Sequence, residues 1–262
     1  MLAQDKFHRP MILVCDSRSK FLDDDFQFEA LLRLLPLQTQ RRILNKKGQD
    51  LKKTALCNQL LQLCGISMVT NLPTHALKLE LSPYGKPACA AMTGLAFNMS
   101  NCDGRTAMYI DAASSVGIDL ATTKDCNNFG DDYLNTFKAI FSPEEFSSLN
   151  QMTPGWLRDK KFTHYWSLKE AYTKFTGTGL NCELSSIDLG ALETWTSVDQ
   201  VYTMFRDIDG KRMVFQSKWL DSKVVITLCK LATPQDDCRI QLLNNSIELT
   251  GAELAVYFDS TK

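Results

Sequence analysis

The segment from 158 to 176 constrains the fold more than any other, because it predicts a long helix with one buried stripe. Its aromatic residues recur at intervals of three and four, the spacing of one helix face. They are Phe162, Tyr165, Trp166, Tyr172 and Phe175. Gly177 and Gly179 follow and favour the end of the helix. We therefore expect a core helix over these residues, with Trp166 supporting the core and His164 packed rather than catalytic.

Charged residues interrupt this apolar pattern. Lys169 and Glu170 are expected to lie off most of the buried stripe, and Lys174 follows Glu170 by one turn on the same side. Ahead of them, the run from Val116 to Ala121 predicts a buried strand that delivers Asp119 at its carboxyl end. Two acids and a lysine on rigid elements can together hold a divalent cation and a phosphate. Taken singly, each signal also has a structural explanation. Asp119 could cap the end of a strand, and Lys169 and Glu170 could be ordinary charged residues on the surface of a helix.

Composition excludes several classes of protein. The chain of 262 residues fits one large domain or two of about 130 residues. Its net charge of -1 shows no excess of positive charge of the kind that nucleic-acid-binding proteins carry. Any site for an anion must therefore come from a local group of basic residues. Nine cysteines lack a C-x-x-C pair, which indicates reduced thiols in the cytoplasm. The chain shows no apolar leader and no run long enough to span a membrane, so neither nucleic acid nor membrane is an expected partner.

The remaining pattern alternates between strands and helices. Strands are predicted over 11–15, 77–81, 97–101, 106–110, 201–205, 213–215 and 224–229, and helices over 26–35, 37–63 and 252–258. The helix over 37–63 is interrupted by Gly48 and is basic in its first half, which fits either a solvated face or an anion site. Ser142, Pro143 and Glu145 predict a capping box at a helix start. Residues 127–130 are expected to form an irregular loop.

The two halves of the chain share an order of elements. Each has a strand, then helices, then antiparallel strands, which suggests an internal duplication of roughly 110 residues. A boundary near Ser114 and Ser115 predicts two domains, 1–114 and 115–262. A ligand site at their junction would take the basic helix and the Gly-Lys-Pro turn from the first half. The second half would supply the two acids and Lys174.

A series of short motifs carries a family resemblance. In order, the chain has Arg42-Ile, Gly85-Lys86-Pro87, Phe97-Asn98-Met-Ser100, Val116-Gly-Ile-Asp119 and Trp166-Ser-Leu-Lys-Glu170 with Lys174. Over roughly residues 25 to 230 this series resembles the Sfp-type 4'-phosphopantetheinyl transferases. The resemblance implies an α+β fold, the duplicated pseudo-dimer of two halves in one monomeric chain. It also implies transfer of 4'-phosphopantetheine from coenzyme A to a serine of an apo carrier domain, with release of adenosine 3',5'-bisphosphate.

The resemblance also implies roles for individual residues. Asp119 and Glu170 would hold Mg²⁺, which favours one or two carboxylates together with substrate phosphates. Asp119, Glu170 and Lys174 would be catalytic. Glu170 would take the proton from the carrier serine, directly or through a metal-bound water, and Lys174 would neutralise charge. The residues implied to bind coenzyme A are Arg42, Gly85, Lys86, Pro87, Asn98, Ser100, Asn101 and Lys174. Of these, Arg42, Lys86, Ser100 and Asn101 would meet its 3'-phosphate or its adenine. The first half thus forms the 3'-phosphate and adenine side, and the second the metal and catalytic side.

The sequence departs from the family pattern at two positions. Ala121 stands where bacterial members commonly carry a third acid, so the third metal ligand is either water or another side chain, with Asp103 a candidate. Asn101 stands where a histidine is common, and we predict that its amide donates a hydrogen bond to the phosphate. Within the family the chain resembles the fungal and animal members that activate the aminoadipate reductase of lysine biosynthesis. The resemblance implies that the carrier domain of that reductase is the partner.

Two other classes of protein remain in view. The first is a non-catalytic homologue that binds coenzyme A or a carrier, and the retention of both acids and Lys174 argues against it. The second is a scaffold in which the Lys-Glu helix is only an interface. An assay of transfer to an apo carrier domain separates the enzyme from both.

Overall fold

The computed structural model describes residues 10–77, 79–81, 87–89, 94–111, 114–130, 132–198, 200–233 and 242–260. These residues form two compact units. Unit 1 contains the described residues up to Ser114 and those from Asn245 onward, and unit 2 is Ser115–Asn244. The division predicted from sequence, 1–114 and 115–262, therefore misplaces the last segment. That segment belongs to unit 1 because its strand pairs with the first strand of the chain.

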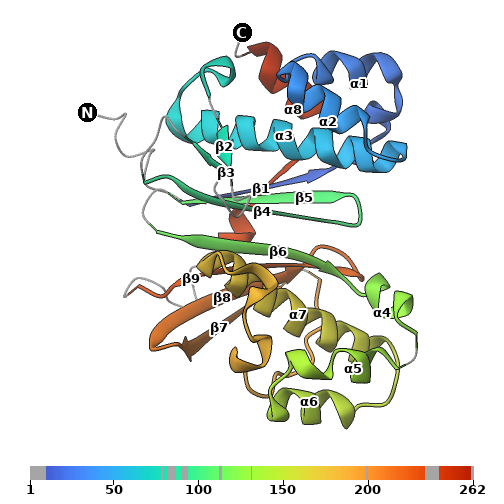
Figure 1. Cartoon of the computed structure of the whole chain (residues 1–262), viewed down its shortest axis with the longest axis vertical. Helices are drawn as coiled ribbons and strands as arrows, with labels where there is room; N and C mark the ends of the chain where they lie inside the picture. The colour runs from blue at the N-terminus through green and yellow to red at the C-terminus, as the bar shows by residue number, and fades with distance from the viewer. Residues whose placement is uncertain are drawn as a thin grey trace. The chain divides into compact units, whose positions relative to one another are not determined.

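Unit 1 consists of a mixed sheet with helices packed on it (Figure 1). Its sheet strands are β1 (Met11–Asp16), β4 (Ala96–Cys102), β5 (Arg105–Asp111) and β10 (Ile247–Leu249), in the order β10-β1-β5-β4. β10 runs parallel to β1, and the other pairs are antiparallel. Two short strands, β2 (Leu79–Leu81) and β3 (Pro87–Cys89), pair separately. Its helices are α1 (Asp25–Leu32), α2 (Leu37–Leu44), α3 (Gln49–Thr70) and α8 (Gly251–Ser260).

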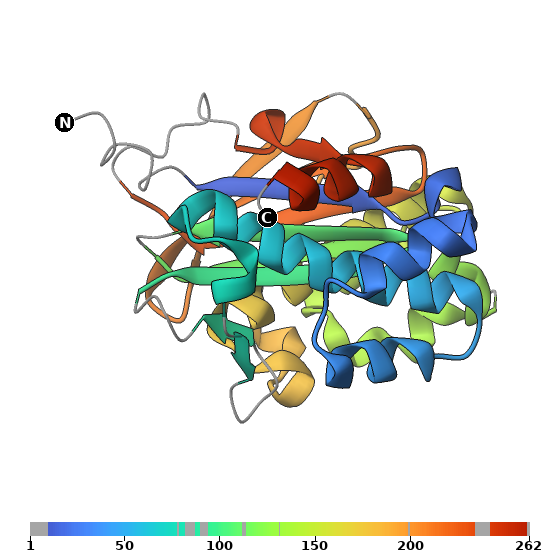
Figure 2. The same ribbon diagram turned by 90° about the horizontal axis from the view of Figure 1, so that it is seen from above.

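Local sequence explains where these elements begin and end. Pro36 precedes α2, and Gly48 adopts a φ of 89° between α2 and α3, so the break predicted at this glycine is confirmed. Asp103 and Gly104 both have positive φ and form the tight turn between β4 and β5. The helix α8 lies beside α3, as the view from above shows (Figure 2). The C-terminal segment thus adds both a strand and a helix to unit 1.

Unit 2 has an antiparallel sheet and one dominant helix. The strands are β6 (Val116–Thr122), β7 (Val201–Ile208), β8 (Lys211–Trp219) and β9 (Val224–Leu231), in the order β6-β9-β8-β7. The helices are α4 (Lys124–Asn128), α5 (Tyr133–Thr136), α6 (Pro143–Asn150) and α7 (Trp156–Thr176). The predicted core helix is α7, which packs on β6 and β9 and ends at Gly177 in the left-handed conformation. The capping box of Ser142 and Glu145 is confirmed at α6.

The two units repeat one order of elements. In each, a first strand is followed by helices that end in a long one, and then by antiparallel strands whose last member pairs with the first strand. This arrangement is the α+β fold expected from the sequence, and it agrees with an internal duplication. Among the described residues, no helix is both long and apolar enough to cross a lipid bilayer.

Two local predictions are wrong. Asp119 lies in the middle of β6 rather than at its carboxyl end, because Leu120, Ala121 and Thr122 continue to pair with β9. Residues 127–130, expected to be an irregular loop, begin inside the short helix α4. The first correction matters for the site, because the ladder with β9 continues through the residues before and after Asp119 and so fixes its backbone.

Candidate active site

The helix α7 lies unusually close to β6, and Gly117 is the reason. A Cβ atom at Gly117 would lie 1.9 Å from the carbonyl oxygen of Ala171 and 2.7 Å from the backbone nitrogen of Phe175. Only glycine fits at such a distance, since the contacts are with backbone that cannot move aside. Two residues further along β6, on the same face, is Asp119. The close approach therefore brings the side chains of α7 directly to this acid.

Asp119 and Lys174 form an ion pair across this contact. The Nζ atom of Lys174 donates to Oδ1 of Asp119 at 2.7 Å, although the residues are 55 positions apart in the chain. The side chain of Asp119 is 5% exposed, whereas that of Lys174 is 25% exposed. The acid is thus buried, whereas part of the lysine side chain reaches solvent. A substrate phosphate can approach the lysine from the open side.

Glu170 completes this cluster. Its Oε1 atom is buried and has no hydrogen-bond partner among the described residues. Burial raises the pKa of the Glu170 carboxyl above its ordinary 4.5, the charge of Asp119 raises it further, and Lys174 opposes part of the rise. A partly buried carboxylate without a partner costs free energy unless a ligand, ion or water satisfies it. A raised pKa also suits a group that accepts a proton near neutral pH.

The donor set of this cluster fits a magnesium ion that is shared with a substrate. Among the described residues, no group of three or more His, Cys, Asp or Glu side chains can hold a metal by itself. Mg²⁺ commonly takes only one or two carboxylates and completes its shell with phosphate oxygens and water. Asp119 and the unpartnered oxygen of Glu170 meet that requirement. Ala121 packs against Trp219 and Val225 and offers no further ligand.

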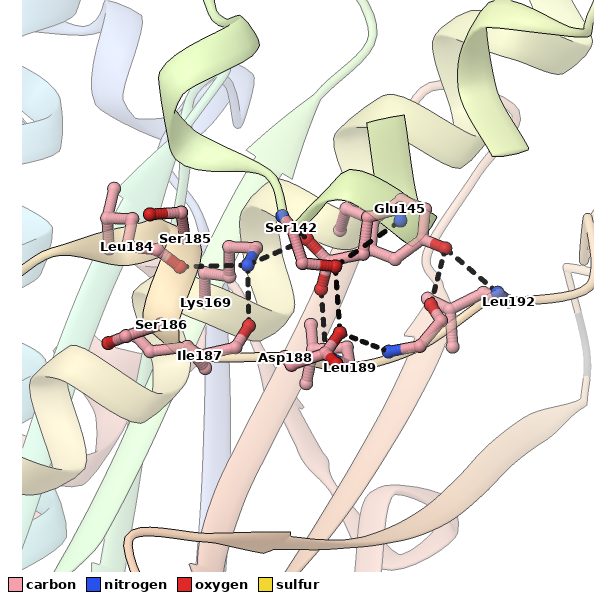
Figure 3. A network of polar contacts seen from close by, with 12 residues as sticks. Ser142, Glu145, Lys169, Leu184, Ser185, Ser186, Ile187, Asp188, Leu189 and Leu192 are labelled. Atoms are coloured by element: carbon pink, nitrogen blue, oxygen red, sulfur yellow. Dashed lines mark hydrogen bonds and ion pairs between the residues drawn. The ribbon is translucent and has the colours of Figure 1, made fainter. Parts of the chain in front are cut away.

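Lys169 does not belong to this cluster, contrary to the expected placement off the buried stripe. It is 1% exposed and forms an ion pair with Oε2 of Glu145 at 2.8 Å. Its ammonium also donates to the carbonyl oxygens of Leu184, at 2.9 Å, and Ile187, at 2.6 Å (Figure 3). Burial lowers the pKa of Lys169, and the charge of Glu145 opposes that effect. The two adjacent residues therefore have different roles. Lys169 stabilises the fold, and Glu170 belongs to the candidate site.

The structural role of Glu145 is confirmed in the same network. Its carboxylate accepts hydrogen bonds from the backbone nitrogens of Ser142, at 2.9 Å, and Leu189, at 2.7 Å. Figure 3 shows these contacts fastening the segment 184–189 to α6 and α7.

The predictions for Trp166 and His164, two aromatic residues of α7, are also confirmed. Trp166 packs against the cluster of Ala121, Trp219 and Val225, and His164 is 2% exposed inside the core.

Unit 1 contains a separate pocket of about 630 Å³ between α2 and α3. Arg42 and Asn101, predicted to meet coenzyme A, both line it, and so does Lys46. Arg42 donates to the hydroxyl of Thr39 at 3.2 Å. Asn58 and Gln59 of α3 also line the pocket, and they were missed by the sequence reasoning. The signal that could have found them is a pair of amides in an otherwise apolar stretch of helix.

The other residues expected to meet coenzyme A are distributed differently. Asn98 and Ser100 are buried and alternate with Phe97, Met99 and Asn101 along β4, so they lie on the opposite face of the strand. Gly85 and Lys86 lie outside the described residues, as does the side chain of Pro87. Asp103, the candidate third ligand, lies in the β4–β5 turn of unit 1 with its Oδ2 3.9 Å from Nη1 of Arg18. Its role as a ligand stays a prediction.

Comparison with known proteins places this site in a family. The family model of the 4'-phosphopantetheinyl transferase superfamily matches residues 115–229, which include β6, α7 and β9. An L-aminoadipate-semialdehyde dehydrogenase-phosphopantetheinyl transferase of Saccharomyces cerevisiae is 40% identical, over 83% of this chain and 79% of its own. A protein of the same name from Eremothecium gossypii is 33% identical over 86% and 80%. A 4'-phosphopantetheinyl transferase of Bacillus subtilis is 28% identical over 57% and 62%.

The chain belongs to the 4'-phosphopantetheinyl transferase superfamily. It is accordingly an enzyme that takes the 4'-phosphopantetheine group from coenzyme A and transfers it to a carrier protein. The matched region contains all three residues of the charged cluster.

Proposed function

We propose that the chain transfers 4'-phosphopantetheine to the carrier domain of an aminoadipate reductase, with Mg²⁺ as the metal. The carrier assignment is supported by the relatives from Saccharomyces cerevisiae and Eremothecium gossypii, whose names specify L-aminoadipate-semialdehyde dehydrogenase. The site assignment is carried by one observation: Glu170 holds a buried, unpartnered carboxylate oxygen beside the Asp119–Lys174 ion pair. Such an arrangement binds a cation and phosphate better than it stabilises a fold.

In the proposed reaction the carrier serine forms a bond from its Oγ to the phosphorus that bears pantetheine. The bond from that phosphorus to the bridging oxygen breaks, and adenosine 3',5'-bisphosphate leaves with the electron pair. Glu170 accepts the proton of the serine hydroxyl. Asp119 and Glu170 would hold the Mg²⁺, and the ion would supply positive charge to the phosphate oxygens. Lys174, anchored by Asp119 and open to solvent, adds positive charge beside the departing bisphosphate.

We further propose that unit 1 supplies the 3'-phosphate and adenine side of the coenzyme A site. The pocket that contains Arg42 and Asn101 supports this assignment for these two residues. Contacts with coenzyme A from Asn98, Ser100 and the turn 85–87 stay predictions, as do a monomeric state and a cytoplasmic location. The seven cysteines whose side chains the structure describes are free thiols, which supports the proposal of a reducing compartment.

The test is transfer of a fluorescent pantetheine group from labelled coenzyme A to several apo carriers. These are the carrier domain of an aminoadipate reductase, a bacterial fatty-acid carrier and a peptide-synthetase carrier. We expect the highest kcat/KM with the aminoadipate reductase domain, and transfer that requires Mg²⁺. Equal or higher kcat/KM with the other carriers would refute the carrier assignment. Binding of coenzyme A without transfer to any of them would favour the non-catalytic homologue.

Variants of the two acids test the site within the same assay. Asp119→Ala and Glu170→Ala are expected to abolish transfer while the protein stays folded. Asp207→Asn is the matched control, because Asp207 forms an exposed ion pair with Arg212 in the same unit. Wild-type turnover in either alanine variant would refute the assignment of Asp119, Glu170 and Lys174 as the catalytic residues.

A further inference from the structure

The helix α2 carries exposed apolar residues on one side. Thr39 and Ile43 are buried, whereas Leu37 is 82% exposed and Leu44 is 48% exposed. Spacings of four and three residues place Leu37, Arg41 and Leu44 on the same side of the helix. Neither leucine belongs to the apolar cluster of unit 1. Packing within unit 1 therefore gives no reason for two leucines on a side that is ordinarily polar in a surface helix.

The surrounding segment is strongly basic. Residues 33–53 include seven arginines and lysines and one acid, a net charge of +6 in a chain whose total is -1. Two of these cations form ion pairs with acids, and two more line the unit 1 pocket. The cations that neither line the pocket nor form an ion pair with a residue that the structure describes are Arg41, Lys47 and Lys52. We define the α2 outer face as Leu37, Arg41 and Leu44, with the exposed Lys47 in the turn that follows.

The chemistry of the α2 outer face fits a protein partner that presents carboxylates beside apolar side chains. The leucines gain free energy only when a partner removes them from water. Exposed cations contribute little affinity by themselves, but they favour an acidic partner, speed its approach and disfavour a basic one. A small anion would use the cations and leave the leucines in water. The combination of both kinds of residue therefore indicates a protein surface.

The position of α2 indicates which protein this partner is. Another side of the helix contributes Arg42 and Lys46 to the pocket that we assign to coenzyme A. The outer face belongs to the same helix, whose diameter with side chains is about 10–12 Å. A protein that covers it therefore lies beside the bound coenzyme A. In a 4'-phosphopantetheinyl transferase, the protein that must meet coenzyme A is the carrier.

We propose that the α2 outer face docks the apo carrier domain, through a carrier surface on which carboxylates flank apolar side chains. This inference rests on the proposed function, because it takes the carrier as the acceptor and the unit 1 pocket as part of the coenzyme A site. Leu37 and Leu44 supply the apolar contact, and Arg41 and Lys47 supply the charges around it. The four residues thus set the affinity for the carrier, which appears in KM for that substrate and not in kcat.

The first test removes the apolar contact. In a double variant with Leu37→Ser and Leu44→Ser, we expect KM for the apo aminoadipate reductase carrier domain to rise about 10-fold at saturating coenzyme A, because two apolar contacts are lost. The value of kcat, the calorimetric Kd for coenzyme A and the urea midpoint should stay at their wild-type values. Val256→Ser is the control, because Val256 is a 69% exposed apolar residue of α8 in the same unit. An unchanged KM for the carrier in the double variant would overturn the proposal.

The second test reverses one charge. In Arg41→Glu we expect KM for the same carrier domain to rise about 10-fold at low ionic strength, and the rise to shrink as NaCl is added, because salt screens exposed charges. Lys20→Glu makes the same change in net charge at an exposed residue outside α2, and its KM should stay near the wild-type value. An equal rise in Lys20→Glu would reveal only a general attraction between the two proteins and would overturn docking at α2. Weaker binding of coenzyme A by Arg41→Glu, with KM for the carrier unchanged, would assign Arg41 to the coenzyme A pocket and overturn it as well.

The remaining outcomes separate this inference from the proposed function. Wild-type transfer to the carrier domain, with KM unaffected in both test variants, would overturn the docking surface and leave the proposed function intact. Binding of coenzyme A by the wild-type enzyme without transfer to any carrier would overturn the proposed function, and the docking surface with it. A wild-type enzyme that sediments as a dimer, and a double leucine variant that sediments as a monomer, would show that a second copy of the chain covers this face. That result would also overturn the proposal.

Discussion

The two long helices pack on their sheets in different ways. In unit 1, Gly65 of α3 lies against the side-chain ends of Leu13, Met108 and Ile110, in an apolar cluster. In unit 2, Gly117 of β6 lies against the backbone of α7, and a buried acid stands two residues away. The same order of elements therefore folds with an apolar contact in one unit and a charged contact in the other. The charges in unit 2 are not needed to hold a helix on a sheet, so they are there for chemistry.

Alanine at the two glycines is the harshest test of this comparison. At Gly117 the new Cβ meets backbone atoms, so we expect Gly117→Ala to prevent unit 2 from folding or to cost more than about 3 kcal/mol, the usual limit for overpacking. At Gly65 the Cβ meets flexible side chains at 2.8 to 2.9 Å, and the loss should be about 1–3 kcal/mol. Urea unfolding of both variants measures the difference. Equal losses would contradict the distinction between backbone and side-chain contact.

Removal of the buried ion pair beside the site should have the next largest effect. Lys169→Met leaves Glu145 charged and fully buried, so we expect a loss of about 3–5 kcal/mol in the free energy of unfolding. Lys53→Met in unit 1 is the matched variant, because its partner Asp23 is 59% exposed and can return to water. Its loss should be about 1 kcal/mol or less. A smaller loss for Lys169→Met than for Lys53→Met in urea unfolding would contradict this account of Figure 3.

The charge of Glu170 should lower stability as pH rises. Because its folded pKa is raised, the folded protein binds this proton more tightly than the unfolded chain does. The resulting stability is fully present below the unfolded value near 4.5 and is lost as pH rises through the folded pKa. Glu170→Gln removes this dependence. The free energy of unfolding of the variant, relative to that of the wild type, should therefore increase as pH rises from 4.5 to neutrality. A gain that shrinks as pH rises would mean that the fold stabilises the ionised carboxylate.

The smallest effect is expected in the pocket of unit 1. We expect Asn101→Ala to weaken coenzyme A binding about 10-fold, the cost of one hydrogen bond to a charged group. Gln38→Ala is the control, since Gln38 is an exposed residue of α2 that does not line the pocket. Calorimetric titration with coenzyme A measures both. Unchanged affinity in Asn101→Ala would refute the predicted amide–phosphate contact.

Much of the fold was predictable because its signals are local. Helical spacing gave α7 to within two residues at its start, Gly48 marked the break between α2 and α3, and the capping box of Ser142 gave α6. The motif residues also predicted that Asp119, Glu170 and Lys174 would meet. The ion pair shows this for Asp119 and Lys174, and the catalytic roles of all three stay predictions.

What the sequence could not reveal depends on long-range pairing. The assignment of β10 to unit 1 follows from its parallel pairing with β1, about which its own residues say nothing. The burial of Lys169 depends on Glu145 and on carbonyl groups of the segment 184–187, which approach only in the folded chain. The neighbours of Asp119 across the unit 2 sheet, which are Thr227, Ser217 and Tyr202 in turn, follow from three strand registers that no local signal predicts.

The central claim is that the charges between β6 and α7 serve catalysis and not folding. It is tested most directly in Asp119→Asn, by measuring transfer to an apo carrier and urea unfolding on the same preparation. We predict that kcat/KM falls by about 10²–10³ or more, while the free energy of unfolding falls by less than the roughly 3–5 kcal/mol that breaking a fully buried pair costs, since the side chain of Lys174 is 25% exposed and can be hydrated. A variant that unfolds readily yet transfers at the wild-type rate when folded would contradict the claim.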